Sequence, residues 1–319
     1  MIQLATNSAD LVRYLPLNKD FDHTLLEPDI DDALRDWILP YLSRVQFDVS
    51  VNNADAKHME LMSIVKKSAF NIALSSWLPI GKVFISEAGI QYGVDKDKQA
   101  SSEDKADAIN AARNKGFKAI DQMLEFLEAN ATTFIVWAGS DSFTIQKDSY
   151  IRNAKEFAII NGSRSVFLRL KSHIQDVERQ YLSEIFPHSL STVLLSREYG
   201  ALVEENRVLH TRLLTNYVMP FVRDMSMAKA ARSMSIIKDQ FGTLTVFDNT
   251  GASHAKGYKT LPKDFLEAWI EELTNAAHGN LTKLSSFLAD NKTAFGIAEE
   301  EKPEQVIYRN DPTHGTAYF

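Results

Sequence analysis

The sequence contains no cysteine among its 319 residues. This absence excludes disulfide bonds, thiolate metal sites, iron–sulfur ligation and cysteine nucleophiles together. The sequence also lacks a run of roughly 20 consecutive apolar residues, the length that a bilayer span requires. Its first 15 residues have no basic region followed by a hydrophobic run and a small-residue cleavage site. We therefore expect neither secretion nor a membrane span.

The sequence motifs of common active sites are missing as well. None of GxGxxG, GxxxxGK[ST], HExxH, GxSxG or the EF-hand loop occurs. The nearest match, residues 138–142 (AGSDS), has Ala and Ser in place of the outer glycines and is typical of a turn. The eight histidines form no i,i+4 pair beside a carboxylate. We expect no catalytic residues, no metal ion and no other cofactor, and we do not expect an enzyme.

Four acidic residues, Asp29, Asp31, Asp32 and Asp36, lie close together near the N-terminus. Two carboxylates on one helix face could bind a hard cation or act as general acid and base. Three of these residues, however, fall in or near the first turn of a predicted helix, where the helix dipole favours negative charge. We therefore interpret the group as structural.

The remaining composition, 45% hydrophobic and 24% charged, is typical of a soluble globular protein long enough for two domains. The net charge of −7 lies in the first part of the chain, because residues 1–150 contain 22 acidic and 15 basic residues. Residues 151–297 contain 15 acidic and 18 basic residues. These two parts could attract each other head to tail between neighbouring chains, or the uneven charge could be chance. The overall acidity argues against a protein that coats duplex DNA.

The sequence repeats internally. Residues 26–38 (LEPDIDDALRDWI) align with residues 170–182 (LKSHIQDVERQYL) at an offset of 144, with Leu, Ile, Asp and Arg identical and the aromatic position kept. Residues 83–89 (VFISEAG) match residues 245–251 (TVFDNTG) in pattern at an offset of 162. Three blocks in one order, whose main change of offset is a single insertion, predict an old duplication.

The third block has the strongest match. Residues 126–134 (FLEANATTF) align with residues 287–295 (FLADNKTAF) at an offset of 161, with five of nine positions identical. The predicted domains are residues 1–148, residues 149–297 and an extended C-terminal tail of residues 298–319. The tail has too little apolar content for a core of its own and could become ordered on a partner.

Hydrophobic periodicity predicts the elements of each copy. In the first copy we expect a helix from near Pro28 and a helix from about Asp55 to Leu78. A hairpin over 82–92 and a long helix from Ser101 or Ser102 to Asn130 follow, and residues 133–137 are a strand candidate. The fold class is mainly α with short β-hairpins, as two tandem copies of a helix-helix-hairpin-helix module.

The second copy is expected to repeat these elements with an insertion between about Pro187 and Leu213. A helix extended over 202–217 should kink or break at Pro220, and Pro262 should lie early in the last helix. Residues 257–262 read as a loop. The last helix should bury one stripe of apolar residues: Leu266, Ile270, Leu273, Leu281, Leu284 and Leu288.

Three further sets of residues are candidates for contacts. Lys229, Arg232 and Lys238, expected on one helix, could contact phosphate along a lumen or groove, or they could be a solvated helix face. Asp32 with Arg35 recurs as Asp176 with Arg179, an i,i+3 pair that could support its helix or orient neighbouring helices. In the tail, the aromatic residues Tyr308, Tyr318 and Phe319 are possible anchors for a partner.

Parts of the first copy resemble a known family. Residues 15–18 (LPLN), 26–30 (LEPDI) and 37–42 (WILPYL) are similar to uncharacterised proteins encoded among virion genes of Bacteroidota phages and prophages. The order helix, helix, hairpin, helix is similar to head-completion adaptors of tailed phages. The resemblance implies a homo-oligomeric ring around the DNA exit channel, with the portal above and the tail or stopper below. Typical adaptors have one module where this chain has two.

Other functions stay open. A tail-completion or baseplate-associated virion protein would follow the same structural logic with different neighbours. A helical enzyme or regulator with an unrecognised site would have a polar pocket buried in only one of the two copies. A DNA-binding regulator would need a concentrated basic recognition helix, and only residues 229–238 come near to one.

Overall fold

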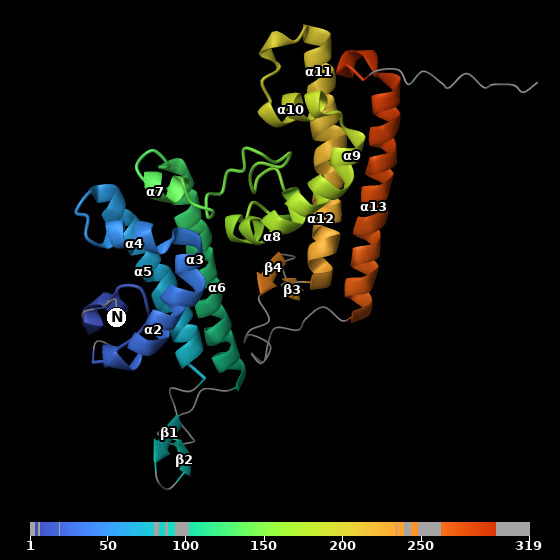
Figure 1. Cartoon of the computed structure of the whole chain (residues 1–319). Coiled ribbons are helices and arrows are strands. Elements are labelled where there is room, and N and C mark those ends of the chain that lie inside the picture. Colours follow the sequence, from blue (N-terminus) through green and yellow to red (C-terminus); the bar gives the residue numbers. More distant parts are fainter. Residues whose placement is uncertain are drawn as a thin grey trace, which may run out of the picture.

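The computed structural model describes residues 4, 5, 7–18, 20–79, 83–86, 89–92, 102–233, 235–238, 244–247 and 263–297. The tail from residue 298, with Tyr308, Tyr318 and Phe319, therefore lies outside the described residues, as do Pro262 and the predicted loop 257–262. The predicted mainly helical fold class is confirmed (Figure 1). No helix in the described ranges is long and apolar enough to cross a membrane.

The first half of the chain contains seven α-helices, a 3-10 turn, a π-helical turn and two short strands within the described residues. In chain order they are α1 (Ser8–Val12), η1 (His23–Leu25), α2 (Glu27–Ala33), η2 (Leu34–Ile38), α3 (Leu39–Leu42), α4 (Arg44–Val51), α5 (Ala56–Trp77), β1 (Val83–Ser86), β2 (Gly89–Tyr92), α6 (Ser102–Ala129) and α7 (Ile135–Ala138), where η1 is a 3-10 turn and η2 a π-helical turn. Pro28 lies in the first turn of α2, and Asp55 caps α5 through a hydrogen bond from the Lys57 backbone N–H. The predicted helix starts are confirmed at both places.

The second half follows the same order with additional segments. Its elements are η4 (Ala158–Ile160), α8 (Arg164–Val177), η5 (Glu178–Leu182), α9 (Ser183–Ile185), α10 (His188–Ser196), η6 (Tyr199–Ala201), α11 (Glu204–Leu213), η7 (Leu214–Val218), α12 (Met219–Ser233), β3 (Ser235–Lys238), β4 (Leu244–Phe247), α13 (Lys263–Asp290) and η9 (Thr293–Phe295), where η5 and η7 are π-helical turns. β1 pairs with β2 and β3 with β4, both antiparallel. β1 and β2 lie at the bottom of the molecule in Figure 1, and β3 and β4 lie near its middle height, at the lower end of α12.

The internal repeat is visible in the backbone. The π-helical turns η2 and η5 lie 144 residues apart, and the 28-residue helices α6 and α13 lie 161 residues apart. Both offsets are those of the sequence alignment. The predicted alignment of the strands at an offset of 162 is wrong, because it places β1 on β4, whereas the chain order places β1 on β3. The length difference is therefore spread over two places instead of one insertion.

An aromatic cluster also repeats with nearly the same geometry. The ring centroids of His58 and Phe134 lie 5.0 Å apart at 72°, and those of His210 and Phe295 lie 5.0 Å apart at 71°. The Phe126–Phe134 and Phe287–Phe295 pairs are both 5.9 Å apart. The equal distances between equivalent rings indicate that the two modules pack these aromatic side chains in the same way.

Residues 133–137 form no strand. Phe134 and Trp137 are fully buried, while Ile135 and Val136 are 72% and 43% exposed. A strand would bury alternate residues, so burial at i and i+3 requires a helical turn, and α7 supplies it. The indole N–H of Trp137 donates to the Tyr41 carbonyl oxygen at 2.9 Å, which fixes this turn against the first helices.

Two prolines follow π-helical turns. Pro40 lies two residues after η2, and Pro220 lies two residues after η7. Proline has no backbone N–H and clashes with the carbonyl group four residues earlier, so one widened turn lets the helix continue. The helix from Glu204 thus runs through Pro220 to Ser233, and the predicted break is wrong. The third π-helical turn, η5, has no such proline.

Each half has its own hydrophobic core. One cluster is built from residues between Leu4 and Trp137, and the other from residues between Tyr150 and Phe295. The predicted stripe of α13 faces the second core, with Ile270, Leu273, Leu284 and Leu288 buried. The boundary between residues 148 and 149 stays a prediction.

Helices α5 and α6 approach each other closely at Gly116. A Cβ atom at this position would lie 2.5 Å from Cγ1 and 3.1 Å from the backbone nitrogen of Ile72. We expect Gly116→Ala to lower the free energy of unfolding by about 1–3 kcal/mol, because overpacking outweighs the helix propensity of alanine. Chemical denaturation measures this change. The control is Gly279→Ala in α13, where a Cβ meets nothing within 4 Å and should stabilise by up to about 1 kcal/mol. Equal effects of the two variants would contradict the close packing.

Candidate functional site at the junction of the two modules

The start of α8 rests on an acidic row of α6. Ser163, which precedes α8, donates from its hydroxyl group to Asp121 Oδ2 at 2.9 Å. The backbone N–H of Ser165 donates to the other oxygen of the same carboxylate, also at 2.9 Å. A carboxylate at a helix N-terminus satisfies free N–H groups and interacts favourably with the helix dipole. Asp121 thereby fixes where the second module begins.

Arg164 completes this contact from the first turn of α8. Its Nε donates to Glu128 Oε2 at 2.9 Å and its Nη2 to Glu125 Oε1 at 3.3 Å. The Arg164 side chain is only 9% exposed, so water competes little for its hydrogen bonds to Glu125 and Glu128. Glu128 also accepts a hydrogen bond from the hydroxyl group of buried Thr144 at 3.0 Å. The charges at the junction therefore satisfy one another within the chain.

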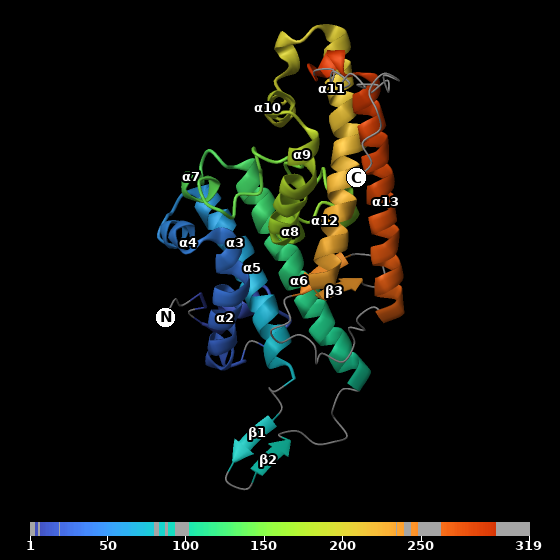
Figure 2. The ribbon, with the colours of Figure 1, turned by 45° about the vertical axis from the view of Figure 1, so that its right-hand side comes forward.

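A second set of contacts lies further along α8. Arg169 Nε donates to the Tyr41 hydroxyl group at 2.7 Å, and its guanidinium group lies 5.6 Å from the centre of the Trp37 ring. Leu168 packs against the core of the first module. Polar, cation–π and apolar contacts thus act together, and they hold unlike faces of the two modules side by side (Figure 2).

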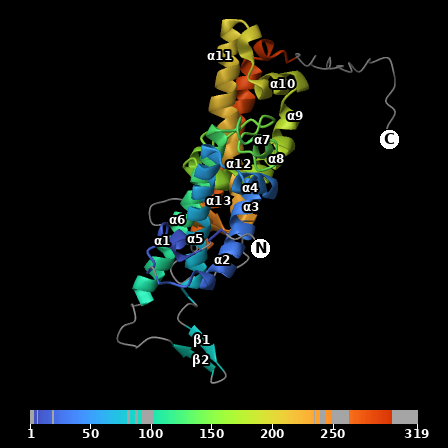
Figure 3. The same ribbon diagram turned by 90° about the vertical axis from the view of Figure 1, so that its left-hand side faces the viewer.

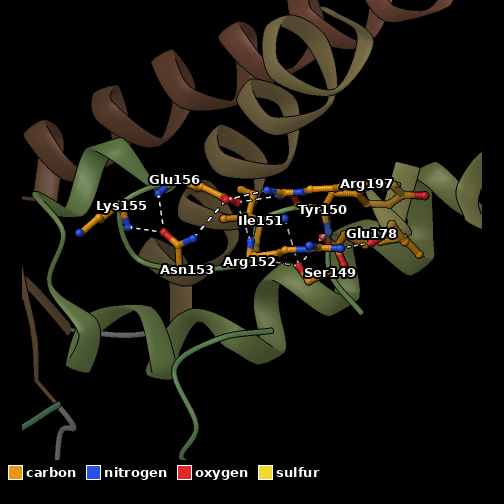
Figure 4. A network of polar contacts seen from close by, with 10 residues as sticks. Ser149, Tyr150, Ile151, Arg152, Asn153, Lys155, Glu156, Glu178 and Arg197 are labelled. Carbon is orange, nitrogen blue, oxygen red and sulfur yellow. Dashed lines mark hydrogen bonds and ion pairs between the residues drawn. The ribbon is translucent and has the colours of Figure 1, made fainter. Parts of the chain in front are cut away.

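The segment after the first module leads into a polar network (Figure 4). Glu178, in η5, accepts hydrogen bonds at Oε1 from the Ser149 hydroxyl group at 2.7 Å and from the Tyr150 backbone N–H at 2.8 Å. Burial raises the pKa of Glu178 to about 7, although these hydrogen bonds act in the opposite direction. This carboxyl group therefore titrates near neutral pH.

The other half of the network centres on Glu156. Arg197 binds its two carboxylate oxygens at 2.7 and 2.9 Å and also donates to the Tyr150 carbonyl oxygen at 2.8 Å. Burial acts to raise the pKa of Glu156, but the hydrogen bonds and positive charges of Arg197 and Arg152 outweigh it and lower the pKa. Arg197 has a left-handed backbone (φ 57°), a conformation that these bonds hold in place.

A cavity of about 350 Å³ opens beside this network. Glu156, Arg197, Thr215 and Arg223 line it, together with the proline that follows η7. Its charged groups are already paired, since Arg197 binds Glu156 and Arg223 Nε donates to Asp224 Oδ1 at 2.8 Å. The cavity can hold a small polar molecule, and its net charge favours neither anions nor cations strongly.

Several buried polar residues occur in only one module. Gln46 and Ser50 are hydrogen bonded to each other at 3.0 Å, and their counterparts at the offset of 144 are the buried residues Leu190 and Leu194. The Trp137 backbone N–H donates to Gln46 Oε1 at 3.2 Å. Gln46 thereby satisfies one of the N–H groups that have no partner within the first turn of α7. Glu178 has the buried residue Leu34 as its counterpart.

The predicted basic candidates do not lie on one helix. Lys229 and Arg232 lie on α12, but Lys238 is in strand β3, so that part of the prediction is wrong. Lys229 Nζ donates to Gln180 Oε1 at 2.5 Å and lies 5.3 Å from the centre of the Tyr181 ring. A lysine used in this way supports its own module, and the role in DNA contact stays a prediction.

The predicted ion pairs are present. Arg35 binds Asp32 at 2.5 Å and Arg179 binds Asp176 at 2.6 Å, both on the surface. Arg35 also binds Asp36 at 3.0 Å. Among the described residues, no three His, Asp or Glu side chains are placed to hold a metal ion.

Sequence reasoning missed the residues that join the modules. Arg164 and Glu128 stand 36 positions apart, and no local pattern connects them. A partial signal existed in α6, where the acids at 121, 125 and 128 have the spacing of one helix face. An acidic row on a long helix indicates a surface that could receive a basic partner.

Comparison with known proteins gives one result that bears on this arrangement. One family model matches the chain twice, over residues 48–147 and over residues 172–302, which together make up more than half of the chain. Two matches in tandem are consistent with the duplication. Neither the search of curated proteins nor the search of solved structures finds a match. The chain therefore belongs to a family of unknown function, DUF6712.

Proposed function

We propose that this protein is a structural virion component, a head–tail connector of the neck that forms a ring joining the portal to the tail. Its partners would be further copies of the chain, the portal protein, and tail or stopper proteins, with DNA passing through the lumen. It would assemble in the host cytoplasm and remain in the virion neck. The resemblance of residues 15–18, 26–30 and 37–42 to a virion-gene family supports this proposal.

The arrangement of the two modules carries the proposal. Two copies of one helical unit stand side by side, with their long helices in roughly the same direction (Figure 3). They meet through unlike faces, α6 on one copy and α8 on the other. Subunits of a closed ring meet in the same heterologous way. A chain built like this supplies two neighbouring wall segments of such a ring.

Apolar residues at one end of the first module support a partner above or below the ring. The exposed side chains are Val45 and Val49 on α4, Met59 on α5, and Ile135 and Val136 on α7. In the second module, α10 carries the residues equivalent to those of α4, and there Val193 and Leu195 are partly covered. The second module also exposes Val203 and Val208 near the start of α11. Exposed apolar side chains at these places suit a partner such as the portal or a stopper.

One observation favours a different class, a helical protein with a small-molecule site. The cavity beside Glu156 and Arg197 belongs to the second module, and the buried carboxyl group of Glu178 has an apolar counterpart in the first. Because the charged groups that line this cavity already pair with one another, we rank the small-molecule function second. A tail-completion or baseplate role would differ from the connector role only in its partners.

The test measures the mass of the purified full chain by light scattering over a concentration series, followed by negative-stain imaging with and without the portal protein of the same virion. We expect closed rings, either from the chain alone or on the portal. A chain that stays monomeric at every concentration and does not bind the portal would contradict the proposal. Saturable binding of a small molecule by that monomer would favour the second class.

A further inference from the structure

The cavity beside the polar network of the second module has an apolar wall and a polar wall. The apolar wall lies where η7 passes into α12 and consists of Leu214, Met219 and Pro220. The polar wall is formed mainly by three charged side chains, those of Glu156, Arg197 and Arg223. Sites for small ligands commonly combine apolar surface with a few polar groups. The hydrogen bonds that these polar groups already make decide which ligand suits the cavity.

The carboxylate of the polar wall, that of Glu156, has no capacity left for a ligand. Its Oε1 accepts hydrogen bonds from Arg197 Nη1 at 2.7 Å and from Asn153 Nδ2 at 3.1 Å. Its Oε2 accepts from the Arg152 backbone N–H at 2.8 Å and from Arg197 Nη2 at 2.9 Å. Four donors fill the acceptor sites of a carboxylate. Glu156 therefore does not select a ligand that brings a cation or another donor.

Arg223, in contrast, keeps donors that no group of the chain uses. Its Nε donates to Asp224 Oδ1 at 2.8 Å, and this pairing balances the charge of the buried aspartate. Within the described part of the chain, no group accepts a hydrogen bond from Nη1 or Nη2 of Arg223. The side chain is 29% exposed and lines the cavity. The two outer nitrogens of a guanidinium group match the two oxygens of a carboxylate.

The polar network behind this wall also has more donors than acceptors (Figure 4). Arg152 Nε, Arg197 Nε and the Tyr199 hydroxyl group are buried and have no hydrogen-bond partner among the described residues. Burial raises the pKa of Tyr199, while the nearby charges of Arg197 and Arg152 act to lower it, so the three groups lie within electrostatic range of one another. Buried donors without acceptors are uncommon, and together they favour a ligand that accepts hydrogen bonds.

We propose that this cavity binds a small carboxylate that carries a short apolar body. The two carboxylate oxygens would accept hydrogen bonds from Nη1 and Nη2 of Arg223, and the apolar body would cover Leu214, Met219 and Pro220. Selectivity would come from the unused donors and not from net charge, since Arg197 already neutralises Glu156. A bound carboxylate would stabilise the second module by binding its folded form. The site lies within one module, so the inference does not depend on the proposed ring.

Calorimetric titration of the full chain with isovalerate tests the class of ligand. Isovaleramide and isoamylamine are the controls, because they keep a similar apolar body and change only the polar end. We expect saturable binding of isovalerate at one site per chain, at least about tenfold weaker binding of the amide, and no binding of the amine. Absence of isovalerate binding, or equal affinities for the three compounds, would overturn the proposal.

Two substitutions locate the site. Met219→Trp fills the apolar wall without removing a charged group and should abolish the binding of isovalerate, and Arg223→Gln should weaken it about tenfold or more. Arg207→Gln, on α11 and outside the cavity, should bind as the parent does. Because Arg223→Gln leaves buried Asp224 without its cation, circular dichroism would check that this variant folds, and Met219→Trp decides the question if it does not. Binding that survives Met219→Trp would overturn the proposal, whereas a failure of the chain to form rings would affect only the connector function.

Discussion

Replacing Arg164 with alanine should lower the free energy of unfolding by roughly 3 kcal/mol. The side chain of Arg164 is almost fully buried between the modules, and Glu128, its main partner, is 22% exposed. Removal of the guanidinium group leaves the Glu128 carboxylate in a poorly solvated position with Thr144 as a remaining donor. Such an uncompensated charge costs more than the pair itself contributes, because its desolvation is no longer offset. Chemical denaturation followed by circular dichroism measures the loss.

The matched control for this variant is Arg179→Ala. Arg179 also pairs with an acid, Asp176, at 2.6 Å, but its side chain is 81% exposed. Exposed pairs of this kind contribute less than about 1 kcal/mol, so the control should be nearly neutral. Arg164→Lys keeps the charge but loses the planar fork that reaches two carboxylates, and it should fall between the two. Equal costs for Arg164→Ala and Arg179→Ala would mean that the junction does not hold the modules together.

Local signals in the sequence predicted most of the helices. Asp55 and Asn130 stand at the ends of α5 and α6 because capping depends on residues within one or two turns. The repeat at offsets of 144 and 161 was visible for the same reason, since each block lies within a single helix and its end. Cap residues and apolar spacing are therefore sufficient to predict the order of the helices within each module.

The errors arose where local patterns are ambiguous. Residues 133–137 contain β-branched and aromatic residues, which favour a strand, yet burial of Trp137 on Tyr41 selects a helical turn. The strands were misaligned because residues 83–89 and 245–251 show similar alternation, and a shift by one strand matches equally well. The π-helical turns were missed because a uniform period of 3.6 residues was expected along each helix, whereas the buried residues Ile30, Leu34, Ile38 and Leu42 follow one another at intervals of four.

The candidate site could not be predicted from local patterns. Arg164 and the acids of α6 come together only when the two modules dock, and Glu178 becomes buried only because residues 149–151 cover it. On its own helix Glu178 follows Asp176 and precedes Arg179, an ordinary surface pattern. In the repeat alignment Glu178 corresponds to Leu34, which is buried in the first module. This correspondence was the one sequence signal for the burial of Glu178, and it depends on the alignment.

Replacing Glu178 with glutamine should remove a pH dependence of stability. The pKa of this carboxyl group rises from its ordinary value of 4.5 to about 7 in the folded protein because the group is buried. Between these two values the folded chain keeps a proton that the unfolded chain has released, so stability falls as the pH rises. The fall approaches roughly 3 kcal/mol above pH 7. Glutamine stays neutral and keeps an acceptor oxygen for Ser149 and Tyr150, so the variant should equal the parent near pH 4 and exceed it near pH 8.

Glu156→Gln provides a control of opposite sign within the same network. The pKa of Glu156 is lowered by Arg197 and Arg152 despite its burial, so its charged form stabilises the fold at neutral pH. That contribution is lost as the pH falls through the lowered pKa, and the variant should therefore be less stable than the parent at pH 7 and similar to it in acid. Urea denaturation at several pH values would give both difference curves. Curves with slopes of the same sign would contradict the assignment of a neutral acid at Glu178, because burial raises the pKa of this carboxyl group while Arg197 and Arg152 lower that of Glu156.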